Sequence, residues 1–232
     1  RKAVEFHKRR GAMATIVLTR VENPLEYGVV ITDPDAQIRR FLEKPDWSQV
    51  FSDTINTGIY ILEPEVLAYM EMGKNYDWSK DIFPQILRDR KPLLGYLATG
   101  YWCDVGNLQA YRQAHYDALR GKVRLNIPGE RSEEDVWVHP TARIEPGVRL
   151  TGPAVIGSHA TVRRGAVIEE LTVLGDSCIV ERGAEVHGSI LWNGAYVGDR
   201  VRMSGSVIGR NSSIDRGSEL EEGAVVGDRS HV

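Results

Sequence analysis

Two adjacent residues of opposite charge, Glu43 and Lys44, stand at the end of an expected strand, which Pro45 stops. A carboxylate can accept hydrogen bonds from two hydroxyl groups, whereas a lysine ammonium interacts with a phosphate as a compact charge. The pair therefore suits a ligand that carries both hydroxyl groups and a phosphate. The same two residues would also make an ordinary exposed ion pair beside a turn.

Three more residues have types that suit ligand binding. Gly28 has no Cβ, so a ligand can approach its backbone closely, although it also fits a simple turn glycine. Asn56 can both donate to and accept from hydroxyl groups, or it can close a turn before a strand. Asp104 ends an apolar run and is followed closely by Gly106, a setting that is most often a turn or a helix cap.

Positioning these residues requires an α/β framework, which the pattern of residues 1–121 predicts. Strands are expected over 14–19, 28–32, 38–42, 57–62 and 93–97, with a short one over 101–103. Helices are expected over 1–10, 64–70, 79–88 and 107–119, the first ended by Gly11 and the third capped by Ser79. Residues 122–136 contain Pro, Gly and a run of charge, and they indicate a linker.

The remaining residues, 137–232, repeat an aliphatic side chain every six positions, beginning at Val138 and Ile144. Hexads of this kind predict a parallel β-helix with three hexads to a coil and about five coils. A mostly small residue four positions after each aliphatic fits the corners. Between Val186 and Ile208 the repeat slips by two residues, and we thread it through Leu191, Val197 and Met203, with Ala195, Val201 and Val207 at the small positions.

Composition excludes several classes of protein. The net charge of −3 lacks the basic excess expected of a nucleic-acid-binding protein. No apolar run approaches the roughly 20 residues that cross a bilayer, so no membrane association is expected. The two cysteines, Cys103 and Cys178, imply no disulfide framework and favour a reducing, cytoplasmic location. His7 and His115 are expected at surface or boundary positions of their helices.

The motifs YGVV (27–30), FLEKP (41–45), NTGIY (56–60) and YWCDVG (101–106) follow one another in the order and spacing found in the second half of sugar nucleotidyltransferases. With the hexapeptide repeat behind them, the chain resembles the mannose-1-phosphate guanylyltransferase-like branch of that family over essentially its whole length. The resemblance implies a partial, Rossmann-like nucleotidyltransferase domain over 1–121, followed by a β-helix that is left-handed over 137–232.

The resemblance also implies roles for individual residues. Glu43 binds the sugar, Lys44 binds its phosphate, and Gly28 and Asn56 complete the substrate site. Asp104 is a ligand of the cofactor Mg²⁺, an ion that favours carboxylate and phosphate oxygens. The implied reaction joins a sugar-1-phosphate, such as mannose-1-phosphate, to a nucleoside triphosphate, such as GTP, and releases pyrophosphate. Lys44 and Asp104 are the catalytic candidates.

One departure from the family is plain. The glycine-rich nucleotide loop and the first metal-binding Asp of the family do not occur within residues 1–232. The chain also starts without Met inside an expected helix and stops within a hexad, so we expect a fragment. By itself, the chain is expected to be inactive.

Two other functions fit parts of the sequence. A regulatory or scaffolding subunit can share this architecture, although it need not keep the EKP and WCD motifs. A β-helix acyltransferase would instead use one of three histidines, His139, His159 or His187, at a seam between subunits. The flat faces and open ends of a β-helix also favour self-association, so a homo-oligomer is expected.

Overall fold

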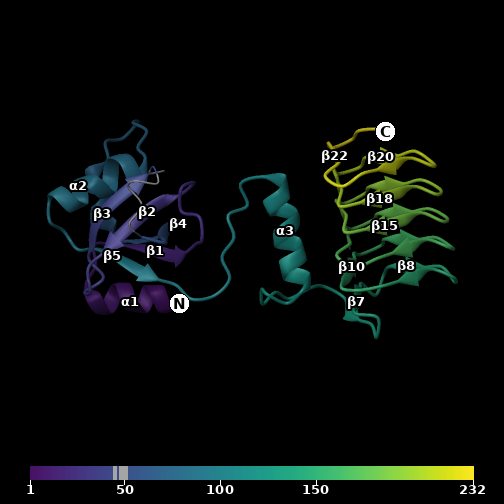
Figure 1. Cartoon of the computed structure of the whole chain (residues 1–232), viewed down its shortest axis with the longest axis horizontal. Coiled ribbons are helices and arrows are strands. Elements are labelled where there is room, and N and C mark those ends of the chain that lie inside the picture. The colour runs from purple at the N-terminus through teal and green to yellow at the C-terminus, as the bar shows by residue number, and fades with distance from the viewer. Residues whose placement is uncertain (44–45, 47–51) are drawn as a thin grey trace. The chain divides into compact units, whose positions relative to one another are not determined.

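The structure, a computed structural model, describes residues 1–43, 46 and 52–232. It divides into two compact units, Arg1–Trp102 and Cys103–Val232. The first is an α/β unit, and the second combines one helix with a solenoid of short strands (Figure 1). Among the described residues no helix is both long enough and apolar enough to cross a membrane.

The first unit is built on a five-stranded sheet of order β3-β2-β4-β1-β5. Its strands are β1 (Ala14–Arg20), β2 (Gly28–Thr32), β3 (Ile38–Glu43), β4 (Thr54–Leu62) and β5 (Leu93–Leu97). All neighbouring pairs are antiparallel except β1 and β5, which run parallel. The five long strands expected from the sequence are confirmed, although β4 starts three residues earlier than expected. The short strand expected over 101–103 is wrong, since residues 101–106 adopt no regular secondary structure.

The helices of the first unit differ in detail from the sequence-based expectation. Helix α1 (Lys2–Arg10) ends at Gly11, whose φ of 57° is the left-handed conformation typical of a helix C-cap. The expected α-helix after β4 is a 3₁₀ helix, Pro64–Tyr69. Next, a π-helical turn, Trp78–Ile82, leads into α2 (Phe83–Arg88). Asp77 caps this turn, not Ser79, because the Asp77 carboxylate accepts hydrogen bonds from the amides of Ser79 and Lys80.

One helix side chain is buried against expectation. His7 of α1 is only 2% exposed, whereas a surface or boundary position was expected. Its Nδ1 lies 2.9 Å from the Thr15 hydroxyl on β1, and its Nε2 lies 3.0 Å from a Glu63 carboxylate oxygen. The two contacts satisfy both ring nitrogens, and they tie α1 to the sheet.

The second unit contains helix α3 (Leu108–Leu119) and three parallel sheets that make the sides of a solenoid. The first side holds β6 (Glu130–Arg131), β7 (Val136–Val138), β10 (Ala154–Ile156), β13 (Val173–Leu174), β16 (Ile190–Leu191), β19 (Val207–Ile208) and β22 (Val225–Val226), with only β6 antiparallel. The second holds β8 (Arg143–Ile144), β11 (Thr161–Val162), β14 (Ile179–Val180), β17 (Tyr196–Val197) and β20 (Ser213–Ile214). The third holds β9 (Arg149–Leu150), β12 (Val167–Ile168), β15 (Glu185–His187), β18 (Arg202–Ser204) and β21 (Glu219–Leu220). The expected β-helix is confirmed, with about five turns.

The inward-facing aliphatic residues make the solenoid core. The threading through the slip is confirmed, since Val186 pairs with Met203, and Leu191 pairs with Ile208, in adjacent strands. One corner was assigned wrongly. Ser206, which is fully buried, occupies the corner two residues before Ile208 in place of Val207, because the turn there is one residue shorter.

A single helix, α3, packs along the first side of the solenoid (Figure 1). Asn107 caps it as expected, accepting a hydrogen bond from the Ala110 amide at 2.8 Å. The Tyr116 hydroxyl donates to the Gly188 carbonyl, and the Arg112 guanidinium donates to the Gly205 carbonyl. The Trp192 indole donates to the Tyr111 hydroxyl at 2.9 Å. Residue Trp192, whose role the repeat did not reveal, therefore packs against this helix.

A column of glycines limits how closely the coils stack. A Cβ added at Gly157 would lie 2.7 Å from the Gly175 carbonyl carbon of the next coil. At the equivalent Gly227, a Cβ would meet only the Ser230 hydroxyl oxygen, at 3.6 Å. We predict that Gly157→Ala lowers the free energy of unfolding of the solenoid by about 1–3 kcal/mol through overpacking. Gly227→Ala, the matched control, should stay within about 0.5 kcal/mol of the parent chain.

Urea unfolding followed by the strand signal in circular dichroism measures both values. Equal stability of the two variants would mean that the coils can separate at this corner without loss.

Candidate functional site

Three of the residues singled out in the sequence occupy one row across neighbouring strands. Gly28 at the start of β2 pairs with Glu43 at the end of β3. The antiparallel register that pairs Val29 with Ile55 sets Gly28 beside Asn56 on β4. Neighbouring strands lie about 4.8 Å apart, so positions 43 and 56 lie roughly 10 Å apart across the glycine. Residues distant in sequence thus meet at one end of the sheet.

Gly28 fills the centre of this row. It lies within a strand and is buried, so the simple turn glycine considered for it is not what the structure contains. In such a row a side chain would project from the sheet between its two neighbours. Glycine projects none, so this position adds no side chain to the row.

Asn56 lies at a bulge in β4. The register with β1 pairs Ile16 with Tyr60 but Leu18 with Asn56, so three residues of β4 lie opposite Val17 alone. The Asn56 side-chain oxygen accepts a hydrogen bond from the Gly58 amide at 2.9 Å, and its nitrogen donates to the Tyr60 hydroxyl at 2.9 Å. Asn56 therefore holds the bulge, and it keeps a second N–H for other partners.

The first and last motifs of the first unit meet through their aromatic residues. The rings of Tyr27 and Trp102 lie 5.6 Å apart at 74°, an edge-to-face contact. Tyr27 directly precedes Gly28, so Trp102 packs beside the start of β2. Trp78 packs with Tyr60 and Phe83 against the core of the unit.

The structure does not place two of the predicted residues in this row. Lys44 falls outside the described residues, and its predicted role stays a prediction. Asp104 belongs to the second unit, in the exposed irregular segment before α3. It is not the cap of that helix, since Asn107 has that place.

No cluster of donor side chains marks the predicted metal site in the part of the chain that the structure describes. Within residues 1–43, 46 and 52–232, no three His, Cys, Asp or Glu side chains gather closely enough to hold a metal ion. The donor chemistry of Asp104 still fits the expected ion, since Mg²⁺ is commonly bound by one or two carboxylates together with phosphates of the substrate. Asp104 thus fits as one ligand of a shared set.

The histidines of the solenoid have local partners. His139 contacts the Thr141 hydroxyl at 2.9 Å, and His187 lies 3.4 Å from a Glu169 carboxylate oxygen. His159 sits at a corner with a φ of 55°. None of these contacts depends on another subunit.

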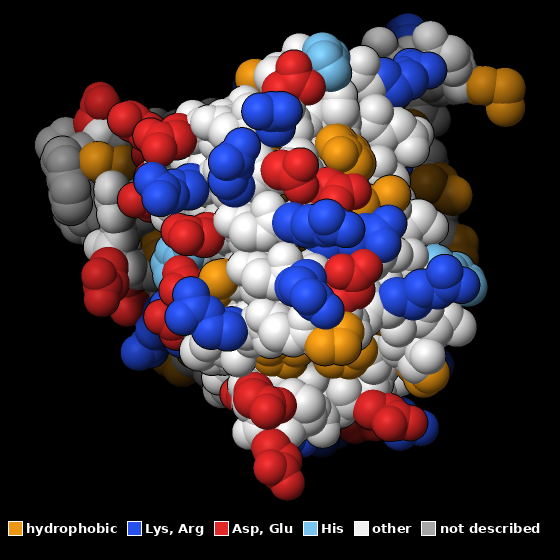
Figure 2. Space-filling view, turned by 90° about the vertical axis from the view of Figure 1, so that its right-hand side faces the viewer, with side chains coloured by type: hydrophobic (Ala, Val, Ile, Leu, Met, Phe, Trp, Pro, Cys, Tyr) orange, Lys and Arg blue, Asp and Glu red, His pale blue; other side chains and the backbone are white. Residues whose placement is uncertain are grey.

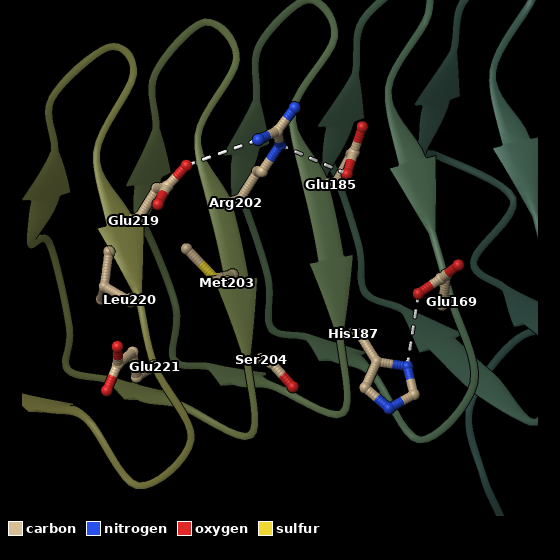
Figure 3. Close-up of a pocket in the computed structure, with 9 residues that line it drawn as sticks. All are labelled: Glu169, Glu185, His187, Arg202, Met203, Ser204, Glu219, Leu220 and Glu221. Carbon is tan, nitrogen blue, oxygen red and sulfur yellow. Dashed lines mark hydrogen bonds and ion pairs between the residues drawn. The ribbon is translucent and has the colours of Figure 1, made fainter.

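His187 borders a shallow groove on the third side of the solenoid (Figure 3). Along it, Arg202 lies between Glu185 and Glu219, at 3.6 and 3.4 Å. All three groups are largely exposed, so these ion pairs contribute little stability. The groove is therefore lined by acidic and basic side chains that pair with one another across neighbouring strands.

Charges of both signs also alternate elsewhere on the solenoid, as the mixed blue and red of Figure 2 shows. Arg163 donates to Glu145 at 2.8 Å and lies 3.9 Å from Glu181. The hydrogen bond from Arg163 holds the pKa of the Glu145 carboxyl below its usual value. By contrast, burial raises the pKa of the Cys178 thiol to about 11, so this cysteine is an unreactive part of the core.

Comparison with known proteins decides the family. The model of the nucleotidyl transferase family matches residues 1–121, which is more than half of the chain. The chain belongs to this family. A second model, described as the GMPPB C-terminal domain, matches residues 150–232, within the solenoid of this nucleotidyl transferase.

Several curated relatives match nearly the whole chain. A UTP–glucose-1-phosphate uridylyltransferase from Synechocystis is 32% identical over 92% of this chain and 56% of its own length. A probable mannose-1-phosphate guanylyltransferase 2 from rice is 30% identical over 99% of this chain and 59% of its own length. A mannose-1-phosphate guanylyltransferase catalytic subunit beta from Drosophila pseudoobscura is 31% identical over 81% and 60%. The chain therefore spans a little over half the length of these relatives.

Reasoning from the sequence missed some contacts of the site. The Tyr27–Trp102 contact and the double role of Asn56 were not foreseen, and both depend on pairing between distant strands. A signal for the bulge was present in NTGIY, since a glycine inside an apolar strand often marks one. Gly58 has a φ of 78°, which fits that reading.

The two roles of Asn56 can be separated by substitution. We predict that Asn56→Ala lowers the free energy of unfolding by about 1 kcal/mol, because the Gly58 amide and the Tyr60 hydroxyl lose their partner. Asn56→Asp retains an acceptor for both groups and should unfold close to the parent chain. Urea titration measures the difference, with Asn75→Ala in an exposed loop as the control. Equal destabilisation by Ala and Asp would contradict the acceptor role.

Proposed function

We propose that this nucleotidyl transferase binds a sugar-1-phosphate and contributes to its joining to a nucleoside triphosphate, with mannose-1-phosphate and GTP as the preferred pair. The observation that carries the proposal is the row of Glu43, Gly28 and Asn56 at one end of the sheet. The similarity to proteins named mannose-1-phosphate guanylyltransferase supports this choice of substrates. Because another relative is named as a UTP–glucose-1-phosphate uridylyltransferase, glucose-1-phosphate is the competing substrate to test.

In the proposed site the sugar lies over Gly28, which itself projects no side chain. The carboxylate of Glu43 accepts hydrogen bonds from sugar hydroxyls, and the free N–H of Asn56 donates to one. The ammonium of Lys44 holds the sugar phosphate by charge. These contacts orient the phosphate and require no protein nucleophile, because the phosphate oxygen is itself anionic.

In the proposed reaction this oxygen attacks the α-phosphorus of the triphosphate. A new P–O bond forms, and the bond to the β-phosphate oxygen breaks, so that pyrophosphate leaves with the electron pair. The catalytic contribution is positioning and neutralisation of charge. When bound, Mg²⁺ supplies positive charge to the phosphate oxygens, with Asp104 as one of its ligands.

We infer from the sequence that this chain lacks the glycine-rich nucleotide loop of the family. We therefore expect the isolated chain to bind the sugar phosphate without turnover. Formation of GDP-mannose by the purified chain would contradict this expectation.

The regulatory subunit is the competing function. Its architecture is the same, and it differs in not needing a phosphate-binding lysine or a metal-binding carboxylate. Sugar-phosphate binding that depends on Lys44 therefore separates the two. The acyltransferase reading gains no support from the histidine contacts described above.

The role of Lys44 is tested by titrating mannose-1-phosphate into the chain by calorimetry. We predict that Lys44→Ala weakens binding about tenfold or more, since a hydrogen bond to a charged group contributes about 1.5–3 kcal/mol. Lys2→Ala on the exposed face of α1 is the matched control. Glucose-1-phosphate should bind more weakly than mannose-1-phosphate. Unchanged affinity of Lys44→Ala would favour the regulatory subunit.

The role of Asp104 is tested by repeating the titration with and without Mg²⁺. We predict that Mg²⁺ strengthens binding of the sugar phosphate and that Asp104→Asn removes this gain but leaves metal-free binding unchanged. Asp199→Asn, at an exposed corner of the solenoid, should behave as the parent chain. A gain from Mg²⁺ that survives Asp104→Asn would exclude Asp104 as a ligand.

A further inference from the structure

The solenoid departs from its regular repeat at three places, and all three contact helix α3. Two turns are one residue short, at Gly188 and at Gly205, whose φ angles are 53° and 52°. The third departure is Trp192, which stands where Gly157 and Gly209 stand in other coils. A repeat that is regular elsewhere has changed where one helix lies against it.

The contacts at these places are specific and polar. Each short turn presents a backbone carbonyl to α3, where Gly188 accepts from the Tyr116 hydroxyl and Gly205 from the Arg112 guanidinium. Trp192 donates to Tyr111, and their rings lie 6.2 Å apart at 66°.

A further side chain packs on each side of this aromatic pair. Arg210 lies over the Trp192 ring at 5.2 Å, and His115 packs on Tyr111 at 4.4 Å. The helix is therefore fixed in rotation and in height along the solenoid.

Two of these anchors lie near the start of the helix. Tyr111 and Arg112 are four and five residues after the cap, Asn107. Asp104 precedes that cap by three residues, in the segment 101–106 that has no strand or helix of its own. Three residues of chain reach at most about 10 Å, so fixing the helix confines the Asp104 backbone to a small volume.

We propose that Arg112, Tyr116 and Trp192 are positioning residues for Asp104, through which the solenoid holds the metal-binding carboxylate in place. The proposal rests on the proposed function of Asp104. A metal ligand depends on its supporting residues for its position, and α3 is the regular element nearest to Asp104 along the chain. The β-helix thereby takes part in metal-dependent binding without touching substrate.

The experiment uses the full chain and the double variant Arg112→Met/Tyr116→Phe, which removes two hydrogen bonds and keeps most of the packing. Gln109→Ala, on an exposed position of the same helix, is the matched control. Trp192→Phe is a second variant that removes the donor to Tyr111 and keeps a smaller aromatic ring. Circular dichroism confirms that each solenoid remains folded.

Two readouts test the proposal. Amide hydrogen exchange of residues 104–112 should become about tenfold faster in the double variant, and less so in Trp192→Phe, while solenoid amides remain as protected as in the parent chain. Binding of mannose-1-phosphate without Mg²⁺ should be unchanged, whereas the gain in affinity from Mg²⁺ should be lost. A purely structural role would not separate these two affinities.

The outcomes are distinguishable. Failure of the parent chain to bind mannose-1-phosphate overturns the proposed function. Normal binding and a normal Mg²⁺ gain in the double variant, together with faster exchange, overturn the positioning role alone. Unchanged exchange in both variants shows that the three contacts do not anchor the helix, and this also overturns the positioning role.

Discussion

Hydrogen bonding between successive coils is the constraint on which the second unit depends. The amides of one coil donate to carbonyls of the next, as from Arg143 to Ala160 and from Thr161 to Cys178. This spacing of about 4.8 Å leaves little room at the corners, so most of them hold a small residue such as alanine, serine, threonine or cysteine. Any change in the length of a turn must keep both neighbours in register. The turns at Gly188 and Gly205 are both one residue short and lie in successive coils, so the shortening itself is stacked.

In the first unit the corresponding constraint is strand pairing across β3, β2 and β4. Local preferences do not bring Glu43, Gly28 and Asn56 together, because Gly28 and Asn56 are 28 residues apart in the sequence. The register does so. The bulge after Asn56 adds residues on β4 opposite Val17, and the hydrogen bonds of Asn56 to Gly58 and Tyr60 stabilise it. Asn56, which was predicted to bind substrate, therefore also stabilises the strand that carries it.

The sequence was sufficient for the parts of the fold whose period is local. The hexads predicted the solenoid and its threading through the slip, and apolar runs predicted the five strands of the first sheet. What it could not predict depends on distant pairing or on competition between nearby caps. Asp77 displaced Ser79 as a cap because its carboxylate accepts from two amides, which one hydroxyl does not do here. His7 is buried because Thr15 and Glu63 satisfy both of its nitrogens.

The slip in the repeat marks the place where the solenoid contacts α3, which the sequence alone did not reveal. Without coordinates, a five-residue step is only an irregularity, and Trp192 only an interruption. The structure explains the short turns, because their carbonyls accept hydrogen bonds from α3. A regular hexad turn would add one residue at each site and move these carbonyls, and the hydrogen bonds from Tyr116 and Arg112 would be lost. The irregular coils are therefore the specific part of a generic scaffold, and the helix that they hold begins four residues after Asp104.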